Sequence, residues 1–315
     1  MSLYKYLIPD RIDVLQNRSI RFTQHMALND PFEMKPFFEL LAEDPIMKRL
    51  FCFGGEGIWN AGFDLGYSTI LMVFDEMKKH FPDESSKREI DEIRNGLPSY
   101  QSLKEQTKQE RPGFLDGLVE SAKQRMPELR NVILTKFNES IGVLSLTQKN
   151  ADILMWAHYA QNNKGFVIEF DNSHEFFNQP KDSGGLFGCL HKVDYSKDRP
   201  NRDSMLDISP SDIFLLKSER WKDEAEWRVL QSLENGKRLE KEGIAILDDE
   251  GQPIYLFSFP PSYITGIIFG SRMSPQNKSK IRHVLSTDDY SHVQRYRAGL
   301  DDRKFEFNIV PDRET

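Results

Sequence analysis

The feature that most constrains the fold is a long helical segment between two strand-rich parts of the chain. Leu3–Leu7 and Ile20–Thr23 have the patterns of short strands, and strand patterns return only after residue 140. Residues 36–139 instead show helical stretches such as PFFELLAEDPIMKRLF and TILMVFDEMKKHF. The first strands must therefore pair with later strands across this segment. We expect an α+β protein with a mixed, largely antiparallel sheet, in which residues 1–35 and 140–315 form the core domain and residues 36–139 a helical insertion.

The part of the chain after residue 140 supplies most of the expected elements. Asn150 or Asp152 is a suitable N-cap for a helix that runs to Ala160. The segment at 165–171 is a strand with Phe166, Ile168 and Phe170 on one face. Further strands are predicted at 141–146, 189–195, 226–231, 244–247, 254–259, 264–269, 292–297 and 304–309, and further helices at 211–220 and 275–285.

Composition excludes several classes of protein. The 42 basic and 49 acidic residues give a net charge of −7, and 22 phenylalanines can build a core. No apolar run is long enough for a membrane helix, and the N-terminal residues lack a secretory signal pattern, so we expect a cytoplasmic protein. Cys52 and Cys189 alone support neither a disulfide framework nor a thiolate zinc site. The acidic total argues against broad binding of duplex nucleic acid, although it is compatible with a local basic groove.

The most informative segment for chemistry is WKDEAEWRV at 221–229. An extended chain would place Glu224, Glu226 and Arg228 on one face of a strand. Two carboxylates separated by two strand positions lie within about 7 Å and suit a reaction with an oxocarbenium-like transition state. The alternative is an exposed edge strand whose charges pair with neighbouring side chains.

Two other segments offer candidate binding residues. In MWAHYA at 155–160, Trp156, His158 and Tyr159 are candidates for contact with a ligand, although a histidine beside aromatic residues is more often structural. The N-terminal candidates are Tyr4, Lys5, Tyr6 and Arg21. The tyrosines could stack on a base and the cations could bind a phosphate. The alternative is that these side chains only pack against the rest of the protein. The seven histidines show no metal-binding spacing, so no metal site is predicted.

The order of several motifs resembles a known family. The motifs are LYKY (3–6), IRFT-x5-NDPFE (20–33), GVLSLT (142–147), MWAHYAQNNKGFVIEFD (155–171), KSERWKDEAEWRV (217–229) and IIFGSRM (267–273). They resemble the bacterial domain-of-unknown-function family 2971, some members of which carry abortive-infection or phage-defence labels. This resemblance by itself implies no reaction.

A more distant resemblance, to mono-ADP-ribosyltransferases, implies a reaction with NAD as the substrate. Those enzymes have an aromatic residue with Arg or His on the first strand, then a strand containing serine, then a late Glu-x-Glu, on a split sheet. Tyr4-Lys5-Tyr6, Ser145 and Glu224-Ala225-Glu226 occur in that order, with Lys5 in place of Arg or His and without the full Ser-Thr-Ser pattern.

The resemblance also implies roles for individual residues. Glu226 would bond the nicotinamide ribose and stabilise the oxocarbenium, Glu224 would direct an unknown macromolecular acceptor, and Ser145 would brace Glu226. Trp156 or Tyr159 would flank the nicotinamide. We expect five cations to lie around one anionic ligand: Lys5, Arg21, Lys164, Lys217 and Arg228.

Two alternative functions remain open. Asp30, Glu33 and Lys35 contain the ingredients of a Mg²⁺ nuclease site, although Asp30-Pro31 and Glu33 also fit a helix N-terminus. The second alternative is a non-catalytic sensor or toxin-partner module that binds a nucleotide or another protein.

Overall fold

The computed structural model describes most of the chain outside the predicted insertion. The described residues are 1–30, 83–103, 134–181, 185–198 and 210–313, together with isolated positions between 32 and 81. Glu33 and Lys35 lie outside them.

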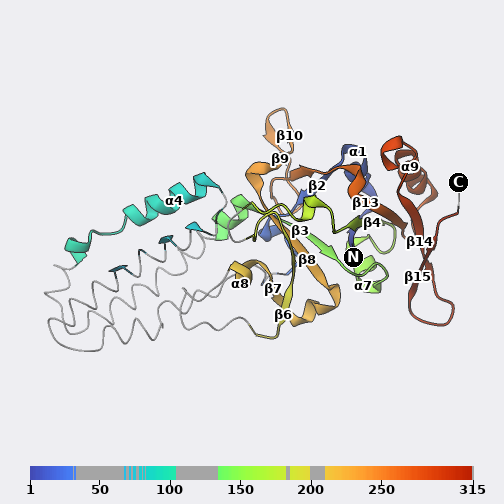
Figure 1. Cartoon of the computed structure of the whole chain (residues 1–315), viewed down its shortest axis with the longest axis horizontal. Coiled ribbons are helices and arrows are strands. Elements are labelled where there is room, and N and C mark those ends of the chain that lie inside the picture. Colours follow the sequence, from blue (N-terminus) through green and yellow to red (C-terminus); the bar gives the residue numbers. More distant parts are fainter. Residues whose placement is uncertain are drawn as a thin grey trace. The chain divides into compact units, whose positions relative to one another are not determined.

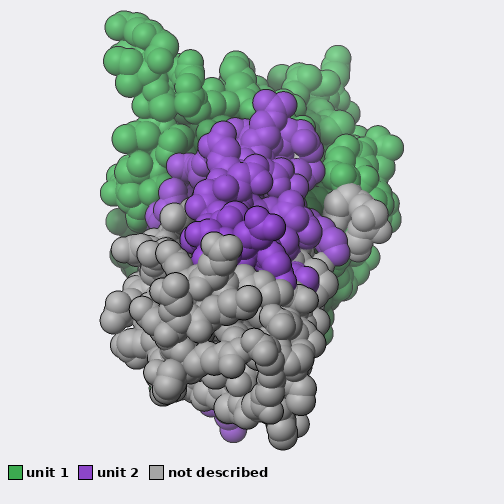
Figure 2. Space-filling view, turned by 90° about the vertical axis from the view of Figure 1, so that its left-hand side faces the viewer, with its two compact units in different colours: residues 1–23, 142–195, 219–315 green, residues 24–141, 196–218 purple. Residues whose placement is uncertain are grey.

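The chain divides into two compact units, which Figure 2 draws in green and purple. The first unit contains Met1–Thr23, Gly142–Tyr195 and Glu219–Thr315, and the second contains Gln24–Ile141 and Ser196–Ser218. The domain boundaries predicted near residues 35 and 140 stay a prediction.

An eight-stranded mixed sheet organises the first unit (Figure 1). Its order is β15-β14-β13-β4-β1-β3-β8-β5, with β13 and β14 parallel. The strands are β1 (Ser2–Leu7), β3 (Ile141–Thr147), β4 (Phe166–Asp171), β5 (Leu190–Lys192), β8 (Glu226–Ser232), β13 (Ile264–Phe269), β14 (Gln294–Leu300) and β15 (Phe307–Pro311). The sheet is mostly antiparallel, which confirms the predicted α+β fold class.

Strand β1 joins the start of the chain to the part that follows the predicted insertion. It pairs antiparallel with β4 along its whole length and with β3 where Tyr4 lies opposite Thr147. The prediction that the first strand pairs with strands after residue 140 is confirmed. Gly165 allows this packing, because a Cβ atom there would lie 2.0 Å from the carbonyl oxygen of Leu7.

The sheet has a different apolar cluster on each face. Leu3, Ile168 and Phe170 belong to the larger cluster, which helix α9 (Pro275–Leu285) covers with Ile281. On the other face, Val167 and Tyr6 pack with helix α7 (Ile153–Tyr159). The predicted alternation in β4 and the predicted bounds of α9 are confirmed, and Asp152 is the cap of α7, since its Oδ1 accepts from the amides of the helix's first turn.

Smaller elements complete the described residues. In the first unit they include the 3₁₀ segment η1 (Pro9–Ile12), α1 (Asp13–Asn17), β2 (Ser19–Phe22), β9 (Lys237–Arg238), β10 (Glu240–Lys241), β11 (Ile244–Ala245) and β12 (Tyr255–Ser258). Strand β6 (Asp194–Ser196) begins in the first unit and ends in the second. In the second unit they include α4 (Glu84–Asn95), α8 (Pro210–Phe214) and β7 (Leu216–Ser218). No helix among the described residues is both long enough and apolar enough to span a membrane.

The predicted helix at 211–220 is correct for residues 211–214 and wrong for the residues that follow. Helix α8 ends at Phe214, and strand β7 and the 3₁₀ helix η6 (Glu219–Glu224) follow it. Ile213, Phe214 and Leu215 are all buried, so neighbouring residues enclose this segment on more than one side. The helix prediction assumes that one face of the helix is exposed to solvent, and this assumption does not hold for these residues. The strand predicted at 189–195 is interrupted at Val193, and forms β5 and β6.

Candidate functional site

A buried ion pair lies at the start of β8. Arg228 Nε donates to Glu226 Oε1 at 2.8 Å, and Arg228 Nη2 donates to Glu226 Oε2 at 3.0 Å. Arg228 is 0% exposed and Glu226 is 4% exposed. These two residues share one face of the strand, as the sequence predicts, and the bidentate pair fixes the Glu226 carboxylate.

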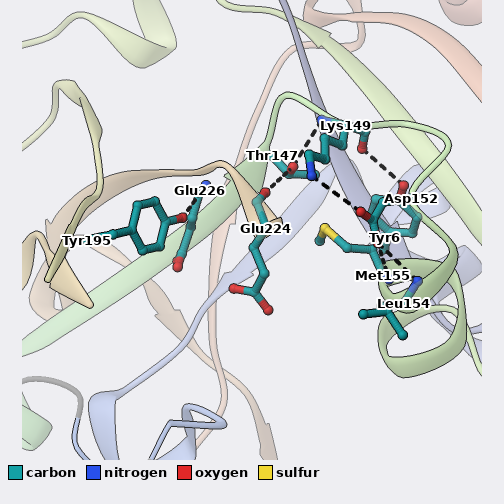
Figure 3. Close-up of polar contacts among 9 residues, drawn as sticks. All are labelled: Tyr6, Thr147, Lys149, Asp152, Leu154, Met155, Tyr195, Glu224 and Glu226. Carbon is teal, nitrogen blue, oxygen red and sulfur yellow. Dashed lines mark hydrogen bonds and ion pairs between the residues drawn. The ribbon is translucent and has the colours of Figure 1, made fainter. Parts of the chain in front are cut away.

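Glu224 does not continue the strand. It ends η6, and Ala225 has a left-handed backbone with φ of 45°. The prediction that residues 224–229 are extended is therefore wrong at its first two residues, because the chain turns at Ala225 before β8 begins. Figure 3 shows that the carboxylates of Glu224 and Glu226 nevertheless extend toward the same side. We call residues 224–226 the Glu-Ala-Glu turn.

Three hydroxyl groups hold the Glu-Ala-Glu turn. Tyr159 donates its hydroxyl hydrogen to Glu224 Oε1 at 2.5 Å, and Thr147 Oγ1 donates to the backbone oxygen of Glu224 at 2.5 Å. The amide of Glu226 donates to the Tyr195 hydroxyl at 2.8 Å (Figure 3). Glu224 is only partly buried, so its side chain is fixed and also accessible.

The left-handed Ala225 gives a prediction about stability. An L-residue in this conformation costs about 1–2 kcal/mol, which glycine avoids at the cost of about 0.5–1 kcal/mol of chain entropy. We expect Ala225→Gly to raise the free energy of unfolding by about 0.5 kcal/mol in urea denaturation. The same change at Ala157 within α7 is the matched control, and should lower stability by about 1 kcal/mol. Equal losses in the two variants would contradict the assignment of strain to Ala225.

Lys5 occupies a gap between strand pairings. On one side of β3, Thr147 pairs with Tyr4 of β1, whereas Val143 pairs with Thr23. The carbonyl oxygen of Ser145 lies between these two pairings and accepts a hydrogen bond from Lys5 Nζ at 2.9 Å. Ser145 thus contributes its backbone to the cluster, and the predicted bracing of Glu226 by its hydroxyl stays a prediction.

Opposing charges act on the Lys5 ammonium. Burial lowers the pKa of Lys5 to about 8, and the nearby guanidinium groups of Arg11 and Arg21 lower it as well. The carboxylates of Glu226 and Glu224 act in the other direction. The cluster therefore combines two carboxylates with several cations, and one of these cations is a lysine whose pKa is lowered to about 8.

The lowered pKa of Lys5 makes stability depend on pH. The folded protein releases this proton near pH 8, whereas the unfolded chain keeps it to about pH 10.5. The unfolded state binds more protons between these values, so Lys5 makes wild-type stability rise with pH. Urea denaturation from about pH 7 to 10 should show wild type gaining about 2 kcal/mol relative to Lys5→Met. Lys237→Met, at an exposed lysine, should show no such trend; a pH-independent difference for Lys5→Met would contradict the burial of the ammonium.

The N-terminal tyrosines do not share the orientation of Lys5. By strand alternation, Lys5 projects with Leu3 and Leu7, whereas Tyr4 and Tyr6 project toward the cluster on the α7 face. The Tyr4 hydroxyl donates to Glu169 Oε1 at 3.4 Å, and burial raises the pKa of Tyr4.

Trp156 and Tyr6 are core residues. Their rings meet edge to face with centroids 5.2 Å apart, and Trp156 is 0% exposed. Trp156 Nε1 donates to the carbonyl of Asn150 at 2.9 Å, and the Tyr6 hydroxyl donates to that of Lys149 at 3.0 Å. The expectation that Trp156 flanks a nicotinamide is corrected, because its ring has no surface for a ligand. Tyr159 contacts Glu224 instead.

The other residues predicted to bind a ligand lie at several places in the structure. Arg21 forms an ion pair with Asp248 and lies close enough to Lys5 to lower its pKa. His158 is exposed at the end of α7, and Lys164 is exposed in the turn before β4. Lys217 is buried in the second unit. Of the five predicted cations, Arg228 pairs with Glu226, and Lys5 lies near both carboxylates of the Glu-Ala-Glu turn.

Sequence reasoning missed Thr147, Tyr195 and Arg11 as members of this cluster. Thr147 is part of the GVLSLT motif, but its hydrogen bond to Glu224 spans 77 residues. Tyr195 lies 31 residues from the amide that it contacts. No local pattern reports contacts of this kind.

The described residues give no support to a metal site. Among them, no three His, Cys, Asp or Glu side chains are grouped so that they could hold a metal ion. Asp30 is buried, and its Oδ1 accepts from the amide of Phe32 at 2.9 Å, as in a helix cap. Because Glu33 and Lys35 lie outside the described residues, the nuclease hypothesis stays a prediction.

One comparison with known families matches part of the chain. Residues 155–229 match the family described as protein of unknown function DUF2971. The match supports the resemblance that the motifs suggest. The matched range contains Tyr159, Tyr195, Glu224, Glu226 and Arg228, so most of the cluster falls within it. No curated protein and no solved structure matches the chain.

Proposed function

We propose that the cluster around the Glu-Ala-Glu turn binds NAD⁺ and breaks the bond between nicotinamide and ribose. One observation carries the proposal: Tyr159 fixes the carboxylate of the partly buried Glu224, which lies two residues from a second carboxylate that is buried and paired with Arg228. Breaking an N-glycosidic bond develops positive charge on the ribose, and a carboxylate already fixed in place stabilises that charge.

The geometry favours a division of roles different from the one that the resemblance implies. Both carboxylate oxygens of Glu226 are engaged by Arg228, and little of the residue is exposed. We therefore assign contact with the ribose to Glu224 and a positioning role to Glu226. Glu226 is the first residue of β8, so its pairing with Arg228 fixes where the Glu-Ala-Glu turn ends and the strand begins.

Lys5 is the cation that we assign to the pyrophosphate of NAD⁺. Arg21 and Arg11 already form ion pairs with Asp248 and Asp13. Lys5 instead donates to a carbonyl oxygen, which a phosphate oxygen can replace or share.

The proposed reaction can end in two ways. The bond between ribose C1′ and the nicotinamide nitrogen breaks, and nicotinamide leaves with the electron pair. A nucleophile then bonds to C1′ and loses its proton. Water as the nucleophile gives ADP-ribose, and a macromolecule gives an ADP-ribosylated product. A role in phage defence or toxicity, as in some labelled members of the resembled family, is part of this proposal.

The test is incubation of the purified protein with labelled NAD⁺, alone and with cell extract, with released nicotinamide and transferred label as readouts. We expect release in at least one condition, and transfer of label would identify the acceptor. Binding of NAD⁺ without release would favour the non-catalytic nucleotide-binding module instead. If the protein neither binds NAD⁺ nor releases nicotinamide, the proposal is overturned.

A further inference from the structure

A second charged region of the first unit is formed by α9 and β14. Residues 251–287 contain no aspartate or glutamate, although the whole chain is acidic. Residues 271–300 hold six basic against two acidic residues, a net charge of +4. Positive charge is therefore concentrated in one part of a chain whose total is −7.

The register of β13 and β14 places two arginines on the face that α9 covers. Arg295 lies opposite Ile267, and Arg297 lies opposite Phe269. Residues paired across neighbouring strands project from the same face. Ile267 and Phe269 pack in the same cluster as Ile281 of α9. Arg295 and Arg297, both exposed, are therefore on the α9 side of the sheet, where Figure 1 shows the helix next to β14.

Helix α9 adds cations to the same side. The guanidinium carbon of Arg282 lies 5.6 Å from the centroid of the Phe269 ring. Lys278 precedes Arg282 by one helical turn, so the two side chains are neighbours. We call Lys278, Arg282, Arg295 and Arg297 the α9–β14 basic surface.

Most of this surface is not neutralised by the protein. Arg282 Nη2 donates to Asp312 Oδ2 at 2.7 Å. The other three side chains make no ion pair or hydrogen bond with the part of the chain that the structure describes. By contrast, many cations elsewhere, such as Arg18 and Lys136, pair with carboxylates.

We propose that the α9–β14 basic surface binds the phosphate backbone of a nucleic acid. Arg295 and Arg297 are two strand positions apart, or about 7 Å, and each guanidinium matches a phosphate in a bidentate way. The cations extend from a strand to a neighbouring helix, so they fit a row of phosphates better than one enclosed anion. The expectation against broad duplex binding follows from the total charge, to which this surface is a local exception. The inference does not depend on the proposed reaction with NAD⁺.

The test measures fluorescence anisotropy of labelled single-stranded RNA, single-stranded DNA and duplex DNA with the full chain. We expect binding of at least one probe, weakening from about 50 to 200 mM salt. With three neutralised phosphates, the slope of log K against log salt should be about −2 on a single strand and about −3 on a duplex. Arg295→Gln with Arg297→Gln should remove two contacts, leaving a slope of about −0.7 on a single strand and weakening binding about tenfold or more.

The matched control is Lys237→Gln with Lys241→Gln, which makes the same charge change at exposed positions on β9 and β10. It should leave affinity and slope unchanged. Melting curves establish that both double variants are folded. The proposal is overturned if none of the probes binds, if both double variants weaken binding equally, or if polyglutamate competes as well as unlabelled nucleic acid.

Discussion

Glu226→Gln is expected to lower the free energy of unfolding by about 3–5 kcal/mol. The substitution removes the negative charge that binds Nε and Nη2 of Arg228, whose side chain is 0% exposed. A buried charge that loses its partner is costly because the protein interior solvates it poorly. Urea denaturation followed by circular dichroism measures the change as a shift of the midpoint at constant slope.

Two further variants make this result interpretable. Glu240→Gln removes the exposed partner of Arg238 and should leave the midpoint unchanged. Glu226→Leu combined with Arg228→Met replaces both charges with apolar side chains and should recover much of the lost stability. If Glu226→Gln proves as stable as Glu240→Gln, the ion pair does not hold the start of β8.

Glu224→Gln is expected to lower kcat/KM for nicotinamide release by about 10²–10³-fold, with an unchanged melting temperature. Glutamine keeps an oxygen that can accept from the Tyr159 hydroxyl, so the turn stays in place. It removes the negative charge that stabilises the oxocarbenium. The measurement is release of labelled nicotinamide across a range of NAD⁺ concentrations.

The control for Glu224→Gln is Glu250→Gln, at an exposed glutamate of the 248–253 turn, which should keep the wild-type rate. A wild-type rate in Glu224→Gln would contradict its contact with the ribose. A different result would be that Glu224→Gln stays active while Glu226→Gln loses more activity than its fraction of unfolded protein explains. That result would return contact with the nicotinamide ribose to Glu226, as the resemblance implies.

The parts of the fold predictable from the sequence are those with clear periodicity. The alternation of Phe166 to Phe170 predicts the faces of β4, and Ser274 with Pro275 marks the start of α9. In both cases local preference and burial favour the same structure. The pairing of β1 with strands after the predicted insertion could also be predicted, because a short strand needs a neighbouring strand and the segment between them shows helical patterns.

The Glu-Ala-Glu turn could not be predicted in the same way. Alternation in EAEWRV favours an extended strand, and alanine rarely adopts positive φ. The turn at Ala225 accompanies a hydrogen bond that Thr147 donates and another that the Tyr195 hydroxyl accepts, and both residues are distant in the sequence. Packing therefore overrides the local pattern at the position that carries the proposed chemistry.

Residue type also misled the assignment of aromatic residues. Trp156 and Tyr159 are both aromatic and both lie in the MWAHYA motif, yet only Tyr159 reaches a carboxylate. Trp156 packs against Tyr6 and Phe307 in the core. Sequence spacing places both on one helix but does not show which elements cover each side of that helix.

The most direct test of the proposed function is a crystal structure of Glu224→Gln with NAD⁺ bound. The variant should bind the dinucleotide without breaking it. We predict that the nicotinamide ribose lies within hydrogen-bonding distance, about 3 Å, of the side chain at position 224, with the pyrophosphate at Lys5. A dinucleotide bound elsewhere on the protein, or a site that stays empty at saturating NAD⁺, would contradict the assignment of this cluster to NAD⁺.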